Sequence, residues 1–374
     1  MRVVLSGYYG FDNAGDEALL TAITSTLKSY RESIEFTVLS GNPKRTEILH
    51  GLRAVSRVNP LVLLRELSRA DLLISGGGSL LQDVTGPLSI PYYLGVTALA
   101  KLMGTPVVFY AQGIGPVNKG FSKFLIKLVA NRMNLITLRD EDSAQLLEAM
   151  GVHTPPVLIT ADPVFSITPT QQDIAEGADF LASLGLTSKT PIIGVSLRYW
   201  EGFSDEKLAR MLDQLTDLGY SVLLLPMQHP EDLVYSRKVS SFMNKQPFIT
   251  DKPLSCLELM GVIANLKVLV GMRLHSLIFS CCAGVPFEGI SYDPKVESFL
   301  NIFGRSSLIN RCDYEPQQVA ETIHQTAVNN DDFLKVIQET AAKLKDKSDD
   351  TARLVLSVVD GTVDKDYIQE RDKL

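Results

Sequence analysis

The chain has 374 residues, of which 45% are hydrophobic and 21% are charged, a composition typical of a globular protein with room for two domains. Its formal net charge of −7 argues against the basic surface of a duplex-binding protein, so we expect no nucleic-acid partner. The first apolar run ends at Ser6-Gly7, and no later run reaches the roughly 18 apolar residues of a membrane span. We therefore expect a cytoplasmic protein.

Short apolar runs alternate with helical patterns through the first half of the chain, a rhythm typical of parallel βαβ units. The expected strands are Arg2–Ser6, Glu35–Ser40, Asp71–Ser75, Pro106–Ala111, Leu135–Leu138 and Val157–Thr160. A second series of the same kind begins after a looser, more polar stretch. Its expected strands are Pro191–Ser196, Ser221–Leu225, Phe248–Thr250, Lys267–Val270 and Phe287–Ser291.

This pattern predicts an α/β fold with two Rossmann-like domains facing each other across a cleft. We place the first domain at residues 1–165, a linker at 166–190, the second domain at 191–345 and a helical C-terminal tail at 346–374. In such folds, ligands bind where strand C-termini and helix N-termini converge. The four cysteines fit neither a disulfide framework nor a metal pattern, and we interpret them as small core residues.

A glycine-rich turn from Gly7 to Gly15 separates the first strand from the first helix. Its spacing departs from the dinucleotide-binding fingerprint, and the acidic pair Asp16-Glu17 would repel a pyrophosphate. Asn13 and Asp16 suit sugar hydroxyls, although both residues could simply cap the helix.

Two further glycine turns, Ser75–Ser79 and Gln112–Pro116, follow other strands, and the three turns together suggest the floor of a site for a bulky polar ligand. A tight turn is the alternative for each one alone.

Basic residues gather after strands of the second half. Arg273 and His275 stand at the positive end of an expected helix, and Arg198 and Lys295 follow two other strands. Phosphoenolpyruvate carries a carboxylate and a phosphate on three carbons and would need this concentration of donors. The alternatives are an interdomain salt bridge for Arg198, solvation for Lys295 and a buried neutral imidazole for His275. His229 is a weaker candidate, and His50, His153 and His324 have no comparable neighbours in the sequence.

Several segments in order, from about residue 1 to 300, together resemble the polysaccharide pyruvyl transferase family. They are Gly-Tyr-Tyr-Gly-Phe-Asp-Asn-Ala-Gly-Asp-Glu-Ala from Gly7, Ser-Gly-Gly-Gly-Ser, Gln-Gly-Ile-Gly-Pro, Leu-Arg-Asp-Glu-Asp-Ser at 138–143, Arg-Leu-His-Ser and Ser-Tyr-Asp-Pro-Lys. The resemblance is closest to the branch that pyruvylates N-acetylmannosamine in the cell-wall polymer to which S-layer proteins anchor.

That resemblance implies a fold like the GT-B glycosyltransferases, phosphoenolpyruvate as donor and a lipid-diphosphate-linked sugar as acceptor. We expect catalysis by His275, Arg273 and Asp16, and donor binding by Arg198, Arg273, His275 and Lys295. We expect acceptor binding by Asn13, Asp16, Gly77, Gln112 and Arg139. No metal or cofactor is expected, because side chains alone can meet the phosphate charge. The nearest alternative is a GT-B glycosyltransferase that uses a nucleotide sugar.

The stretch from Val84 to Arg139 contains no Asp or Glu. Within it, Lys119, Lys123 and Lys127 recur every four residues and would share one face of a helix. A core-packing helix with a solvated basic side is one interpretation. Because the expected acceptor hangs from a membrane lipid, we predict instead a reversible, peripheral contact with an anionic membrane through these lysines. A non-catalytic partner of an envelope assembly is a further alternative, although Arg273 and His275 together argue against it.

Overall fold

The computed structural model describes residues 1–374 apart from 85, 87, 188–189, 310–313 and 363–374. Within this part the chain forms two compact units. The first unit contains Met1–Phe11, Asp16–Ser166 and the described chain from Leu344 onward. The second unit contains Asp12–Gly15 and Ile167–Lys343. Four residues of the first glycine turn therefore belong to the second unit.

The first unit is built on a seven-stranded sheet whose strands are all parallel, in the order β3-β2-β1-β4-β5-β6-β7. Its strands are β1 (Arg2–Tyr9), β2 (Glu35–Ser40), β3 (Arg53–Ser56), β4 (Leu72–Gly76), β5 (Val107–Gln112), β6 (Leu135–Leu138) and β7 (Val157–Ile159). The strand order reverses between β1 and β4. Ligands of open parallel sheets bind at such a switch point, beyond the carboxyl ends of the strands.

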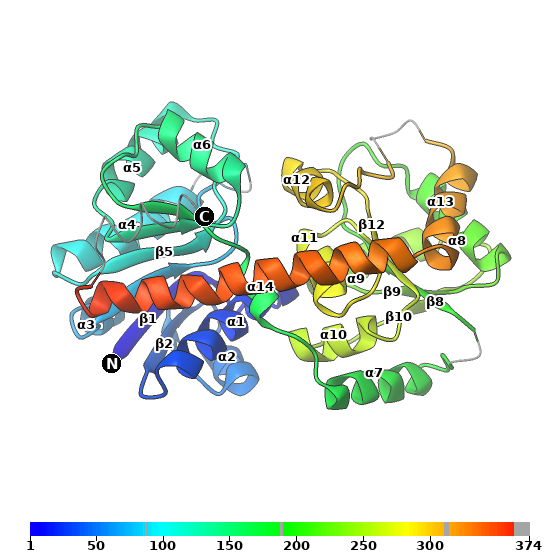
Figure 1. The fold of residues 1–374 in the computed structure, drawn as a ribbon, viewed down its shortest axis with the longest axis horizontal. Coiled ribbons are helices and arrows are strands. Elements are labelled where there is room, and N and C mark those ends of the chain that lie inside the picture. The colour runs from blue at the N-terminus through cyan, green and yellow to red at the C-terminus, as the bar shows by residue number, and fades with distance from the viewer. Residues whose placement is uncertain (85, 87, 188–189, 310–313, 363–374) are drawn as a thin grey trace. The chain divides into compact units, whose positions relative to one another are not determined.

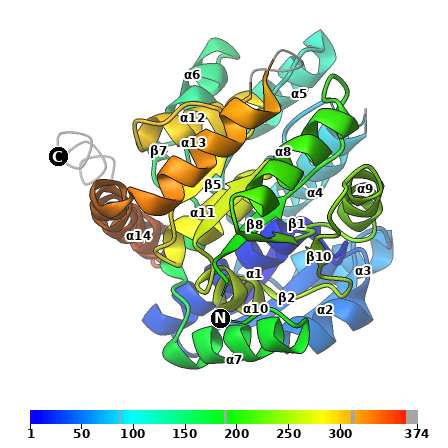
Figure 2. The same ribbon diagram turned by 90° about the vertical axis from the view of Figure 1, so that its right-hand side faces the viewer.

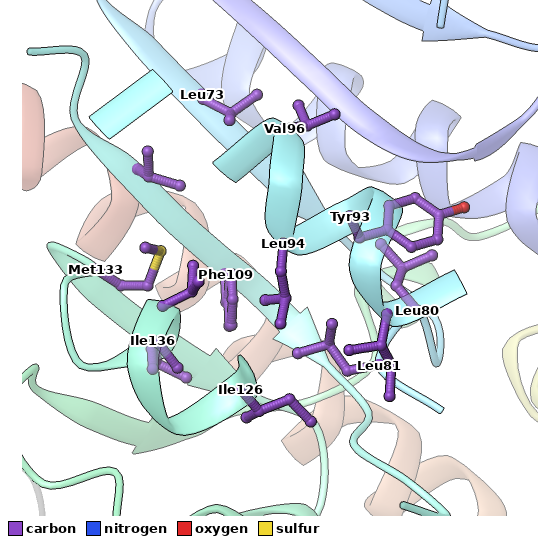
Figure 3. Close-up of a cluster of buried hydrophobic side chains, with 14 of the residues drawn as sticks. Leu73, Leu80, Leu81, Tyr93, Leu94, Val96, Phe109, Ile126, Met133 and Ile136 are labelled. Atoms are coloured by element: carbon purple, nitrogen blue, oxygen red, sulfur yellow. The ribbon is translucent and has the colours of Figure 1, made fainter. Parts of the chain in front are cut away.

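Helices cover both faces of this sheet (Figure 1). They are α1 (Ala14–Tyr30), α2 (Pro43–His50), α3 (Pro60–Leu67), α4 (Ser89–Leu102), α5 (Gly120–Ala130) and α6 (Glu141–Ala149), and a 3-10 turn, Pro163–Ser166, follows β7. Successive side chains of a strand point to opposite faces of the sheet, so consecutive residues contribute to different core clusters. Leu73 belongs to the same core cluster as Leu94 of α4 and Ile126 of α5 (Figure 3), whereas Leu72 belongs to the cluster that contains Ile23 of α1.

The C-terminal helix α14 (Asp331–Val359) begins among the residues of the second unit and ends among those of the first. Ala352 and Val355 are fully buried in the core cluster that also contains Leu5. The Ser348 hydroxyl donates to the carbonyl oxygen of Pro163 at 3.2 Å. The described part of the tail expected at 346–374 is thus an integral part of the first unit.

The second unit contains a five-stranded parallel sheet in the order β10-β9-β8-β11-β12. Its strands are β8 (Ile192–Ser196), β9 (Ser221–Leu224), β10 (Phe248–Ile249), β11 (Val268–Gly271) and β12 (Phe287–Gly289). Its helices are α7 (Gln171–Ser183), α8 (Asp205–Asp217), α9 (Glu231–Ser240), α10 (Cys256–Ile263), α11 (Leu274–Cys282), α12 (Pro294–Ile302) and α13 (Pro316–Val328). The order reverses between β8 and β11, which gives this sheet a switch point of its own.

Helix α7 lies within the stretch expected as a linker, residues 166–190, and packs along α10 (Figure 2). Gly177 and Gly261 allow this close packing. A Cβ added to Gly177 would stand 2.2 Å from the carbonyl carbon of Gly261, so any larger residue would push the helices apart.

The expected α/β class with parallel, Rossmann-like sheets is confirmed, and every expected strand forms with ends that differ by at most a few residues. Strand β3 was missed, because Arg53–Ser56 is short and carries little of the apolar pattern of its neighbours. Cys256 and Cys281 are buried and Cys282 is partly buried, while Cys312 lies outside the described residues. No helix in the described ranges is both long and apolar enough to cross a bilayer.

Candidate active site

The strands at the switch point of the second sheet lead directly into two of the predicted arginines. Arg198 follows β8, and Arg273 follows β11 as the residue that precedes helix α11. Because β8 and β11 are paired neighbours, both arginines leave the sheet at the same edge. This is the juxtaposition that an anion-binding site at a switch point requires.

Arg273 is held in place by a buried carboxylate that the sequence analysis did not identify. Its Nε and Nη2 atoms donate to the two carboxylate oxygens of Asp232 at 2.7 and 2.6 Å. The side chains of Arg273 and Asp232 are only 11% and 2% exposed. Asp232 also accepts the backbone N–H groups of Met227 and Gln228. The guanidinium is therefore fixed in one orientation by a bidentate ion pair.

Tyr292 stands close to both arginines. Its hydroxyl accepts a hydrogen bond from Nη1 of Arg198 at 2.8 Å, and the Arg198 guanidinium lies 5.0 Å from the centre of its ring. Burial raises the pKa of Tyr292, and the positive charges of Arg198 and Arg273 oppose that rise. The ring of Trp200 lies 4.7 Å from that of Tyr292 and is partly exposed. The phenol therefore lies beside Arg198 and within the electrostatic reach of Arg273, and it can donate to a bound anion.

His275 lies in the first turn of α11, directly beside Gly15. A Cβ added to Gly15 would stand 2.2 Å from Nδ1 of His275, so only glycine leaves room for this imidazole. The first glycine turn thus serves a steric purpose that its sequence spacing did not reveal.

Asn13 joins the same group of residues in the second unit, although we expected it in the first domain. Its backbone forms an isolated bridge with Gln228, and its Nδ2 atom donates to Oε1 of Gln228 at 3.4 Å. That oxygen also accepts from Nη2 of Arg273 at 3.0 Å. Oδ1 of Asn13 accepts the backbone N–H of Gly15. Asn13 therefore belongs to a network that runs through Gln228 to Arg273 and Asp232.

Lys295 and His229 lie at two other strand ends of this sheet. Lys295 is in the first turn of α12, and its backbone N–H donates to the carboxylate of Asp293. The backbone N–H of His229 donates to the carbonyl oxygen of Asp12. Burial lowers the pKa of His229 against the opposing charge of Asp232, which favours a neutral ring.

The three glycine turns follow β1, β4 and β5, which are adjacent in the first sheet, although Asp12–Gly15 of the first turn belong to the second unit. The backbone N–H of Gly113 donates to the carbonyl oxygen of Gly78 at 2.8 Å, and that of Gly77 donates to Tyr110. Gly78 has a φ of 70°, and Oδ1 of Asp16 would lie 3.2 Å from a Cβ at that position. The structure therefore brings Asp16 and two glycine turns together, as the sequence analysis expected.

Arg139 is buried beneath these turns and holds them in place. Nη1 donates to Asp162 at 2.9 Å and Nη2 donates to the Ser79 hydroxyl at 3.1 Å. A Cβ added to Gly113 would lie 2.9 Å from its Nε atom. Gln112 is completely buried, and its amide forms no hydrogen bond within the described part of the chain. In this conformation both residues lie below the surface, whereas Asp16 is only partly buried.

His50 was set aside in the sequence analysis, yet it forms a buried pair with a residue of the first helix. Its Nε2 atom lies 2.7 Å from a carboxylate oxygen of Glu17, whose other oxygen accepts the backbone N–H of Gly10. The pair thereby fixes the first glycine turn. No local pattern reveals this contact, because His50 and Glu17 are 33 positions apart in the sequence.

The model of the family described as "Polysaccharide pyruvyl transferase" matches residues 13–294, a span that includes every candidate site residue except Lys295. The chain belongs to the polysaccharide pyruvyl transferase family. It is therefore a transferase of the kind that moves pyruvyl groups to polysaccharides. Among curated relatives, the amylovoran biosynthesis protein AmsJ of Erwinia amylovora is 22% identical over 356 residues, which cover 79% of this chain and 84% of the relative.

Solved structures with low sequence identity share the fold of this polysaccharide pyruvyl transferase family member. The UDP-GlcNAc 2-epimerase of Neisseria meningitidis is 11% identical with a TM-score of 0.64, over 96% of this chain and all of the other. HepE of Anabaena, solved with UDP-glucose, is 13% identical with a TM-score of 0.59, over 100% and 99% of the two chains. A glycosyltransferase of Rickettsia africae is 13% identical with a TM-score of 0.64, over 97% and 99%. These likenesses support the expected GT-B-like architecture.

Because the family transfers pyruvyl groups, the expected catalytic role of Asp16 can be tested by its effect on that activity. We expect Asp16→Asn to lower the turnover of pyruvyl transfer by about a hundredfold or more, the range of a lost general base, while the melting temperature stays unchanged. Asn13 already provides an oxygen for the start of the helix, so the asparagine should cost little stability. Thermal melting and initial rates of both proteins, with exposed Asp179→Asn as the control, measure this. Parallel loss of stability and rate would leave Asp16 as a capping residue.

Proposed function

We propose that the chain transfers pyruvate from phosphoenolpyruvate to two hydroxyls of one sugar, forming a cyclic ketal and releasing phosphate. The proposed acceptor is N-acetylmannosamine in a lipid-diphosphate-linked precursor of a secondary cell-wall polymer, as in the branch that the sequence resembles most. This assignment goes beyond the family match, which supports pyruvyl transfer to polysaccharide in general.

The observation that carries the proposal is the position of Arg198 and Arg273 beyond neighbouring strands, with the Tyr292 hydroxyl bonded to Arg198 and within the electrostatic reach of Arg273. Phosphoenolpyruvate presents two anionic groups within a three-carbon skeleton. An arginine can grip a carboxylate or a phosphate with two parallel hydrogen bonds, so a pair of arginines matches both ends of this donor. Asp232 offsets part of the positive charge and keeps Arg273 oriented before the donor arrives.

Ketal formation requires an acid, a base and a cation clamp. One proton goes to the methylene carbon of the donor, a sugar hydroxyl adds to the carbon that bears the phosphate, the C–O bond to phosphate breaks, and the second hydroxyl takes its place. The two hydroxyl protons account for the new methyl hydrogen and the proton on the released phosphate. We assign the acid to His275, the clamp to Arg198 and Arg273, and the base to Asp16.

The glycine turns of the first unit provide the proposed acceptor surface. Asp16 is accessible there, while Arg139 and the Glu17–His50 pair keep the turns in their observed conformation. Lys295 and Asn13 remain proposed donor and acceptor ligands, respectively. The proposed reaction needs no metal or cofactor, since basic side chains can neutralise the negative charge of the donor and of the departing phosphate.

The decisive experiment follows phosphate release from phosphoenolpyruvate with a diphosphate-linked acceptor that contains N-acetylmannosamine. We expect release only when both substrates are present, and one pyruvyl ketal for each phosphate by mass spectrometry. An acceptor ending in N-acetylglucosamine is the matched control. Turnover with a nucleotide sugar and none with phosphoenolpyruvate would instead establish the alternative, a GT-B glycosyltransferase, which the family match disfavours.

We further propose that the first unit docks reversibly on an anionic membrane through α5. Phe121, Phe124 and Leu128 are 67%, 59% and 43% exposed, and exposed Lys123 and Lys127 adjoin them on the same helix. Exposed Lys119 precedes the first turn. A core-packing role accounts for Ile126 and Val129 but leaves the two phenylalanines in solvent. An apolar stripe beside lysines is the composition of a helix that lies in the membrane interface.

Sedimentation with vesicles tests this docking surface. Each lysine near an anionic surface contributes about 1 kcal/mol, so reversing Lys119, Lys123 and Lys127 to glutamate should lower partitioning by about a hundredfold or more at low salt. The control reverses three exposed lysines of the second unit, Lys245, Lys252 and Lys335. If the two triple variants and the wild type partition alike on phosphatidylglycerol vesicles, the proposal is wrong.

A further inference from the structure

Arg57 lies just beyond strand β3 in a cage of aromatic rings. Its guanidinium carbon stands 4.1 Å from the ring centre of Tyr92, 5.2 Å from that of Tyr93 and 5.4 Å from that of Phe11. The Tyr92 hydroxyl donates to the backbone carbonyl of Arg57 at 2.9 Å, which ties the cage to the chain that carries the cation. The ring of Tyr8 stacks on Phe11 at 4.2 Å. Arg57 is therefore held by ring faces and lies beside the hydroxyls of Tyr92 and Tyr93, and the five N–H groups of its guanidinium exceed these two contacts.

No carboxylate of the described residues forms an ion pair with Arg57. Arg53, at the start of β3, differs in this respect, because it donates two hydrogen bonds to Glu66. Arg57 is partly buried as well, so its charge is only partly solvated. A partly buried guanidinium that is caged by rings and lacks a carboxylate is suited to bind an anion from outside the chain.

The hydroxyl of Tyr93 is a second polar group in the same cage. The Tyr93 side chain is buried, and its hydroxyl makes no hydrogen bond of acceptable geometry within the described chain. Figure 3 shows this hydroxyl pointing away from the apolar cluster on which the ring packs. Burial raises the pKa of Tyr93 to about 12, with the nearby charge of Arg57 and the approach of its guanidinium to the hydroxyl acting against the rise. The group therefore remains a protonated donor at neutral pH, beside a cation.

We propose that Arg57 and the Tyr93 hydroxyl bind a phosphate or diphosphate group at the carboxyl edge of the first sheet. The site lies on the elements that bear the acceptor turns: Phe11 belongs to the first turn, and Tyr93 is on α4, which follows the second. The charge of Asp16 also acts on Tyr93, which places the cage within electrostatic reach of the proposed base. The diphosphate that links the sugar to its lipid is the matching ligand, and this last assignment rests on the proposed function.

Calorimetric titration with inorganic pyrophosphate tests the site without any catalysis. Both the parent and the test protein carry Arg198→Gln, which removes a competing cation of the second unit. We expect Arg57→Gln to weaken pyrophosphate binding about tenfold or more, since a hydrogen bond to a charged group is lost. Arg57→Lys, which keeps the charge but not the planar fork, should weaken it less and guards against misfolding of the glutamine variant. The matched control Arg53→Gln should bind as the parent does. Equal binding by the parent and Arg57→Gln overturns the proposal, as does an equal loss in Arg53→Gln.

Kinetics in the otherwise unchanged chain distinguish the source of the phosphate. We expect Arg57→Gln to raise KM for the diphosphate-linked acceptor about tenfold and to leave KM for phosphoenolpyruvate unchanged. A rise in KM for phosphoenolpyruvate alone would assign the site to the donor and overturn the acceptor assignment. If the chain releases no phosphate from phosphoenolpyruvate at all, the proposed function fails while the pyrophosphate titration still decides the site.

Discussion

Replacing Arg273 with alanine should remove most of the turnover with phosphoenolpyruvate. A hydrogen bond between an arginine and an anion contributes roughly 1.5 to 3 kcal/mol, which is about 10- to 150-fold in rate before any extra stabilisation of the departing phosphate. The same change should also lower stability. It leaves the Asp232 carboxylate buried without its cation, and breaking a buried pair costs about 3 to 5 kcal/mol.

A second substitution separates these two effects. The double variant Arg273→Ala, Asp232→Ala removes the stranded carboxylate, so we expect it to recover much of the lost melting temperature and none of the lost turnover. Arg237→Ala is the control, because Arg237 forms only an exposed salt bridge with Asp251. Near-normal turnover of the folded Arg273→Ala protein would remove Arg273 from the proposed donor site.

For His275→Gln we expect a loss of about a hundredfold or more in kcat with little change in the affinity for phosphoenolpyruvate. This is the range of a missing general acid, because glutamine can still donate a hydrogen bond but cannot deliver a proton. Single-turnover rates and equilibrium binding of the donor measure the two quantities separately. Weakened binding with an unchanged rate at saturation would make His275 a phosphate ligand instead.

Gly15→Ala provides an independent test of the position of His275. The added Cβ would overlap the imidazole, so we expect turnover to fall although His275 itself is intact. Alanine is favoured over glycine inside a helix by about 1 kcal/mol, so α1 should not suffer. Gly95→Ala in α4, where a Cβ meets open space, is the matched control and should leave turnover unchanged.

The fold was predictable from the sequence because most strands are short, buried apolar runs that end in glycine or polar turns. Strand β3 escaped notice because its residues Arg53 and Ser56 are polar, and the strand exists through pairing with β2. Membership of the two units was harder to predict. Asp12–Gly15 belong to the second unit through backbone contacts such as the hydrogen bond from the N–H of Ala14 to the carbonyl oxygen of Met227. These residues are more than 200 positions apart, so no local sequence pattern predicts the contact.

In the candidate site too, residues that belong to a local sequence pattern were predictable, and residues that depend on long-range contacts were not. Arg198, Arg273 and His275 could be proposed from the sequence because each follows a recognisable strand, and the strand order brings them to one edge of the sheet. Asp232 was missed because its partner Arg273 is 41 residues away on another element. The rings around Arg57 were missed for a similar reason, since they come from a loop and a helix that only the fold brings together.

The path of α14 constrains how this protein can be synthesised. The cluster around Leu5 and Ile23 is completed by Ala352 and Val355, which leave the ribosome after the residues of the second unit. Until then the nascent first unit exposes the apolar residues that α14 covers, while the second unit, Ile167–Lys343, has emerged almost entirely. The N-terminal unit therefore reaches its native core last, reversing the usual vectorial order, and a nascent chain stalled near residue 343 would expose a surface that chaperones recognise.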